Sequence, residues 1–199
     1  MKFIKQCITP AVGFKLNTAH SAKFCEFLGA NMQKILVSAC LLGHRVRYDG
    51  NDMTAQSGWL ECWQGEGRTI PFCPERAAGL PIPRPPAEIR GGDGDTVLSG
   101  DAMVTDREGA DLTGRFIQGA EVALSICIEQ GIHIAIMSES SPSCGSTTIY
   151  NGHFCGKKVP GAGVTTALLR RHDIHVFSQH TILSAAEYLA GMENIAPVE

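Results

Sequence analysis

Short apolar runs alternate with helical stretches along most of this 199-residue chain, and this alternation restricts its fold more than any other feature. The runs have the length and composition of buried β-strands and lie at 34–39, 69–73, 132–137 and 174–178. Helical patterns lie between and after them, at 57–64, 116–130, 163–172 and 182–192. Strands that alternate with helices form a mostly parallel sheet covered on both faces. We therefore predict a single-domain α/β fold of the Rossmann-like, doubly wound type.

A proline-rich segment at 79–94 interrupts this alternation. Its prolines exclude a helix and a central strand, because proline lacks a backbone N–H and its φ angle is fixed. We predict an extended surface loop, and loops of this length are often functional. The following residues, 96–105, have a strand-like composition and are expected at a sheet edge.

The first 31 residues differ from the rest of the chain. Lys15 and Lys23 interrupt any apolar stretch that a signal peptide would need. Met32 begins a segment, MQKILVSAC, that is typical of a protein start. We expect residues 1–31 to be a loosely attached extension, disordered or added by upstream translation, and the α/β domain to span 32–199.

Charge and composition exclude several classes of function. The net charge is −3, so no basic field favours a nucleic acid or an anionic membrane surface as a partner. No run of about 18 apolar residues predicts a membrane-spanning helix. Eight cysteines without a secretion signal indicate a reducing compartment, and we expect the protein in the cytoplasm. In such a compartment, cysteines bind metal, take part in catalysis or fill the core.

Three cysteines occupy equivalent places in this predicted fold. Cys40 follows the first strand, Cys73 ends the second, and Cys144 lies in the loop after the third. Loops beyond the carboxyl ends of parallel strands converge at one edge of a sheet, where ligands bind. We therefore expect these thiols to meet in one pocket. Cys127 lies on the apolar face of a predicted helix and is expected to pack in the core.

Three thiolates in one pocket fit two kinds of metal centre. Zinc binds three protein ligands and keeps a fourth position open, and a cubane iron–sulfur cluster takes thiolate ligands. The spacing alone does not distinguish them. Glu75 follows Cys73 by two residues and is a candidate general base. Ser140, Ser141 and Ser143 supply hydroxyls that could orient a substrate or bond to cluster sulfurs.

Several ordered motifs resemble one known family. They are SACLLGHRVRYDG, FCPERAAGLPIPRPPAEI, FIQGAEVAL, SPSCGSTTIYNGHFCGKKVPGAGVTTALL and IHVFS, within residues 34–178. The chain resembles the family catalogued as domain of unknown function 523, whose characterised members are TudS-like, iron–sulfur-dependent thiouracil desulfidases. The resemblance implies a 4Fe–4S cluster bound by Cys40, Cys73 and Cys144, with the fourth iron open because it has no cysteine ligand. It also implies catalytic roles for Glu75 and for Ser141, with Ser143 as the alternative.

The resemblance further implies a reaction and a substrate class. The reaction is a non-redox desulfidation of a thiolated pyrimidine, 2- or 4-thiouracil or thiouridine, to the oxo base with release of sulfide. The substrate sulfur would bind the open iron while Glu75 activates water or relays protons. Ser140 would contact the substrate. Many relatives carry a lysine where this chain has Ser138, which puts the choice of substrate in question.

Other functions stay open at this point. A zinc- or thiol-dependent hydrolase would use the same three cysteines, and a cluster-bearing redox sensor would use them without turnover. Glu75 argues against a sensor, because a sensor needs no general base. We expect a free small molecule as the partner, no nucleic acid and no membrane, and a monomer or small homo-oligomer.

Overall fold

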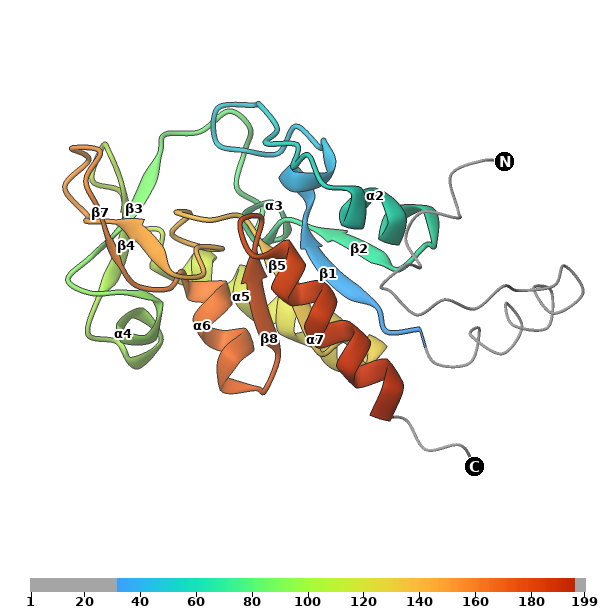
Figure 1. Cartoon of the computed structure of the whole chain (residues 1–199). Helices are drawn as coiled ribbons and strands as arrows, with labels where there is room; N and C mark the ends of the chain where they lie inside the picture. The colour runs from blue at the N-terminus through green and yellow to red at the C-terminus, as the bar shows by residue number, and fades with distance from the viewer. Residues whose placement is uncertain (1–31, 196–199) are drawn as a thin grey trace, which may run out of the picture.

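The computed structural model describes residues 32–195, and a four-stranded parallel sheet lies at its centre (Figure 1). The sheet order is β2-β1-β5-β8. Its strands are β1 (Ile35–Ser38), β2 (Thr69–Phe72), β5 (Ile134–Met137) and β8 (His175–Ser178). All three neighbouring pairs are parallel, which confirms the predicted fold class. The predicted extension at 1–31 lies outside the described residues.

One face of the sheet packs against α2 (Gly58–Gly65) and α7 (Ile182–Ile195). Ile35 and Val37 of β1 point to this side and are fully buried. They contact a core that includes Leu60 of α2. Successive side chains of a strand point to opposite faces, so the residues between them must be covered from the other side.

The other face packs against α5 (Thr113–Gln130) and α6 (Val164–Arg171). Leu36 of β1 is buried here together with Cys127 of α5, so Cys127 is a core residue as predicted. Ile128, the next residue of the same helix, is by contrast 67% exposed. Helices thus cover both faces, and the central strands β1 and β5 are wholly apolar except at Ser38.

Smaller elements extend the molecule to one side of the parallel sheet (Figure 1). They are β3 (Ala87–Arg90), α4 (Gly94–Ser99), β4 (Met103–Asp106), β6 (Thr148–Tyr150) and β7 (Lys158–Pro160). β3 pairs with β4, and β6 with β7, both antiparallel. Their apolar side chains share a third core with Phe116 of α5 and Val164 of α6.

Two sequence predictions in this region were wrong. The segment 79–94 is not a loop throughout, because Ala87–Arg90 forms β3 and Ile89 is buried in the third core. Residues 96–99 are helical rather than extended, because Asp93 accepts hydrogen bonds from the amides of Asp95 and Thr96 and so caps α4. A good helix cap outweighs the weak strand preference of Thr and Val in this stretch.

Within residues 32–195, no helix combines the length and apolarity needed to cross a membrane.

The short helix α3 (Pro74–Ala77) is held against α5 at Gly119. A Cβ atom at Gly119 would lie 2.4 Å from the carbonyl oxygen of Pro74, so only glycine allows this approach. Because Pro74 follows Cys73 directly, the contact with α5 fixes the position of the Cys73 turn.

We predict that Gly119→Ala lowers the free energy of unfolding by about 1–3 kcal/mol, because the backbone of α3 must move away. Gly114→Ala, in the first turn of the same helix, is the matched control, since nothing lies within 4 Å of a Cβ there. Urea denaturation of both variants measures the difference. Equal stability of the two variants would show that the contact is not tight.

Candidate active site at the carboxyl edge of the sheet

A cavity of about 680 Å³ opens beyond the carboxyl ends of the parallel strands. β2 and β5 lie on opposite sides of β1, so the strand order reverses here, and ligands bind at such switch points. Cys40, Cys73 and Cys144 all line this cavity, together with Glu75. The structure therefore brings together residues that are far apart in the sequence.

Each cysteine is carried by a different kind of turn. Cys40 lies in a 3-10 helix, η1 (Ala39–Leu42), directly after β1. Cys73 is the residue before the first turn of α3, whose first position is Pro74, a residue well suited to starting a helix. Cys144 lies in the loop between β5 and β6. Cys40 and Cys144 are buried and Cys73 is half-buried.

The three thiols influence one another electrostatically. Burial raises the pKa of Cys40, of Cys73 and of Cys144. The neighbouring thiols add to this, since Cys40 raises the pKa of Cys73, and both raise that of Cys144. Three neighbouring thiolates shielded from water would repel one another, so their ionised form requires a bound cation. The donor set is soft and suits iron–sulfur or zinc chemistry.

The three cavity thiols are candidate ligands of a metal centre. Among residues 32–195, no three His, Cys, Asp or Glu side chains are arranged to hold a single metal ion. A cubane cluster accepts each thiolate at a separate iron, so its ligands converge less closely. The soft donor set of the three thiols suits such a cluster.

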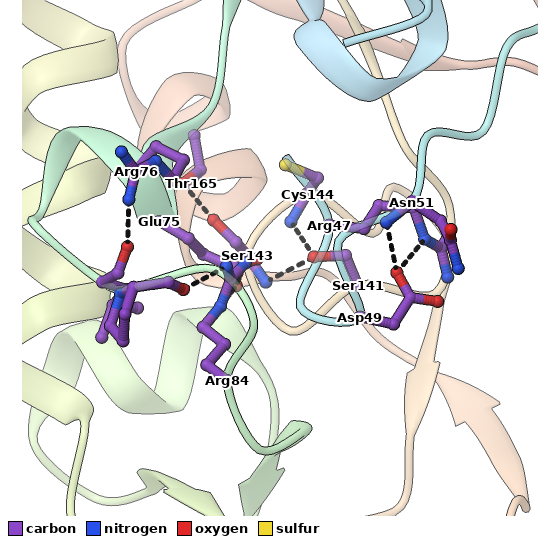
Figure 2. A network of polar contacts seen from close by, with 12 residues as sticks. Arg47, Asp49, Asn51, Glu75, Arg76, Arg84, Ser141, Ser143, Cys144 and Thr165 are labelled. Carbon is purple, nitrogen blue, oxygen red and sulfur yellow. Dashed lines mark hydrogen bonds and ion pairs between the residues drawn. The ribbon is translucent and has the colours of Figure 1, made fainter. Parts of the chain in front are cut away.

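Ser141 and Ser143 have different surroundings. The hydroxyl of Ser141 accepts hydrogen bonds from the amides of Ser143 and Cys144, both at 3.1 Å (Figure 2). Ser141 lines the cavity and caps the turn that carries Cys144. Ser143 is fully buried, and its hydroxyl bonds to that of Thr165 at 2.9 Å. Of the two candidates, only Ser141 lines the cavity.

Ser140 and Ser138 also line the cavity. Ser140 adopts a left-handed backbone conformation with φ of 64°, and its hydroxyl lies 3.2 Å from that of Thr148. Ser138 is buried, and its hydroxyl lies 3.8 Å from the thioether sulfur of Met53. Ser138 therefore presents a short, neutral side chain to the cavity.

Glu75 forms a shielded ion pair with Arg84 across the cavity wall (Figure 2). The exposed fractions of their side chains are 16% and 6%. The Nε atom of Arg84 donates to Oε2 of Glu75 at 3.0 Å, and its Nη2 donates to the same oxygen. Arg84 also donates to the carbonyls of Pro81 and Tyr48. The proline-rich segment is thereby anchored as one wall of the cavity.

Cationic and aromatic side chains line another part of the cavity. The guanidinium carbon of Arg107 lies 5.9 Å from the ring centre of Phe154, and Nζ of Lys158 lies 5.6 Å from that of Tyr150. All four residues line the cavity, as does Arg47. The sequence pattern did not predict the β6-β7 hairpin that supplies three of them. Its strands have three residues each, too few for a period to be recognised.

Comparison with known proteins identifies the family. The model of the 2-thiouracil desulfurase family matches residues 35–181, which include every residue of the site described above. The chain belongs to the 2-thiouracil desulfurase family. It is similar to the uncharacterized protein YbbK of Bacillus subtilis strain 168, with 40% identity over 148 residues, 74% of this chain and 97% of that protein.

A solved structure is also similar to this member of the 2-thiouracil desulfurase family. It is that of a 4Fe–4S-dependent thiouracil desulfidase, TudS, with 51% sequence identity and a TM-score of 0.73. The match covers 79% of this chain and 98% of that chain. The fold and the family are therefore established from independent comparisons.

We predict that Ser141→Ala loosens the turn at Cys144, because two amides lose their common acceptor. Alkylation of Cys144 by iodoacetamide, followed by mass spectrometry, should be about fivefold faster or more, corresponding to about 1 kcal/mol. Ser143→Ala is the comparison variant. It should lower global stability by about 1–3 kcal/mol, because Thr165 loses its buried partner. An unchanged rate of Cys144 alkylation in Ser141→Ala would show that Ser141 does not hold this turn.

Proposed function

We propose that this protein is a 4Fe–4S-dependent desulfidase that converts a thiolated pyrimidine to its oxo form and releases sulfide without net redox change. The observation that carries the proposal is the convergence of Cys40, Cys73 and Cys144 on one cavity at the carboxyl edge of the sheet. Membership of the family and the similarity to TudS support it.

The three cysteines would hold the cluster and leave one iron without a protein thiolate. When bound, such a cluster supplies a soft Lewis acid that suits the sulfur of a thiocarbonyl group. An iron held by soft ligands prefers sulfur to oxygen at the open position.

Glu75 is the proposed general base. It lines the cavity two residues after Cys73, and Arg84 holds one of its oxygens, Oε2, through two N–H groups. That fixed orientation leaves Oε1 to accept a proton from water as the water attacks the carbon that carries sulfur. Arg84 is the residue that orients the base.

Ser141 is the proposed hydrogen-bond donor to the substrate. A hydroxyl has one proton and two lone pairs. Both lone pairs of Ser141 are engaged by the amides of Ser143 and Cys144. Its proton is therefore directed elsewhere, and the cavity that Ser141 lines is where an acceptor on the pyrimidine would lie. Ser140 would contact the substrate from the neighbouring position.

The cavity has room for more than a bare base. Its volume, about 680 Å³, is within the range of sites for drug-sized ligands. Arg107 and Lys158 would attract a negative group attached to the pyrimidine, and the aromatic rings beside them would contact a ribose. We therefore favour a free thiolated nucleoside or nucleotide over a polymer. The oligomeric state and the cytoplasmic location stay predictions.

Anaerobic reconstitution with iron and sulfide tests the proposal. The protein should bind four irons and release sulfide from thiouracil, thiouridine or thiouridine monophosphate without added reductant. Cys40→Ala should lose all desulfidation, because one of three cluster ligands is gone. Cys155→Ala, an exposed cysteine of the β6-β7 hairpin, is the control and should keep it.

Two other outcomes would contradict this proposal. Activity that follows added zinc rather than iron would indicate the zinc-dependent hydrolase. A stable cluster without sulfide release from any member of the panel would indicate a sensor.

We predict that Glu75→Gln lowers kcat by about 10²–10⁴-fold, the usual contribution of a general base. Glutamine keeps the size of the side chain and a hydrogen bond to Arg84, so iron content should not change. Iron per chain and sulfide release are measured on the same preparation. Full activity of this variant with a complete cluster would remove Glu75 from the proton-transfer step.

A further inference from the structure

The carboxylate of Glu139 is surrounded by donors from the loop that follows it. Its Oε1 accepts hydrogen bonds from the amides of Ser146 and Thr147 at 3.0 Å and of Thr148 at 2.9 Å. The Ser140 amide lies 3.3 Å from the same oxygen, and the Thr148 hydroxyl 3.2 Å. The hydroxyl of Ser146 donates to Oε2. One side chain thus forms hydrogen bonds with both ends of the loop.

The loop that Glu139 closes contains Ser141 and Cys144. Cys144 is the one proposed ligand that lies neither in a helical turn nor directly beside one end of a strand. The amide of Glu139 itself donates to Oε1 of Gln179 at 2.9 Å, which connects the loop to the segment after β8. The carboxylate therefore fixes the backbone that carries Cys144, as regular secondary structure does for Cys40 and Cys73.

The negative charge of Glu139 strengthens the hydrogen bonds within the loop. Burial by itself would raise the pKa of this carboxyl group, but the hydrogen bonds from Ser146, Thr147, Thr148 and Ser140 lower the pKa to about 2. The group is therefore ionised at neutral pH, and its hydrogen bonds are charge-assisted and strong. A carboxylate held in this way is a poor proton acceptor, which separates its role from that of Glu75.

The loop also contains a strained residue. Ser140 has a φ of 64°, a left-handed conformation that costs a serine about 1 kcal/mol. Such a conformation persists only where the surroundings hold it. The amide of Ser140 points to Glu139, so the carboxylate stabilises the turn that leads the chain from β5 into the cavity.

We propose that Glu139 is the positioning residue of the cluster site: it holds the 140–148 loop in the conformation that presents Cys144 to the cavity. The proposal rests on the proposed function only in taking Cys144 as a cluster ligand. It assigns Glu139 no contact with the cluster or the substrate.

The test is the rate at which reconstituted Glu139→Gln loses iron to a chelator under anaerobic conditions at neutral pH. Glutamine keeps the shape but not the charge, so iron should leave about ten- to a hundredfold faster than from the unchanged protein. Asp106→Asn is the matched control. Asp106 is a buried carboxylate that accepts the amides of Glu108 and Ala110 in a turn outside the cavity, and iron release should stay within about twofold.

Two further measurements make the result decisive. Thermal unfolding of both variants shows whether faster release merely follows lower global stability. Hydrogen exchange should be faster at the amides of residues 146–148 in Glu139→Gln and unchanged elsewhere in the sheet. If that variant does not fold, Glu139→Asp, which keeps the charge on a shorter side chain, should also release iron faster than the unchanged protein.

The proposal would be overturned if Glu139→Gln released iron at the rate of the unchanged protein. If Glu139→Gln does not fold, the same result for Glu139→Asp would overturn it. Equal acceleration by Asp106→Asn at equal loss of stability would also overturn it. Failure of the proposed function looks different, because the unchanged protein would then hold a cluster without releasing sulfide from any thiopyrimidine. The chelator assay requires no turnover, so the two failures are distinguishable.

Discussion

The parallel pairing of β1 with β2 and β5 is the constraint on which the rest of the structure depends. Parallel pairing places the carboxyl ends of all the strands at one edge, so whatever follows each strand must share that edge. Four short strands suffice because helices bury both faces of the sheet. The three thiols, the carboxylate of Glu75 and the serine loop are close together for this reason alone.

The edge of the sheet supplies proximity, and local contacts supply geometry. Gly119 lets α5 approach Pro74 and so fixes Cys73. Arg84 secures the proline-rich wall to Glu75. Both are specific tertiary contacts, distinct from the hydrogen bonds that form the helices and strands. A rigid sheet with individually anchored loops holds reactive groups more precisely than mobile loops would.

Much of the fold was predictable from the sequence, because long periodic patterns reflect burial directly. The runs at 34–39 and 132–137 are strands, and their apolar composition follows from a sheet covered on both faces. The position of Cys40, Cys73 and Cys144 after strands then predicted a common pocket. The 96–99 stretch was assigned wrongly because one capping side chain, Asp93, outweighs local composition.

The finer arrangement of the site could not be predicted in this way. Ser141 and Ser143 are two residues apart with the same chemistry, and only the turn decides that one lines the cavity while the other bonds to Thr165. Glu139 has no pattern around it that indicates six hydrogen bonds, because they come from a loop without periodicity. The conformation of the loop, which no periodic pattern announces, determines both.

Mössbauer spectroscopy of protein reconstituted with ⁵⁷Fe under anaerobic conditions tests the central claim most directly. Three cysteine ligands make one iron of a 4Fe–4S cluster different from the other three. The account predicts two signals in a ratio of about 3:1, with only the minor signal changing when thiouracil is added. Four equivalent irons, or a spectrum that thiouracil leaves unchanged, would contradict it.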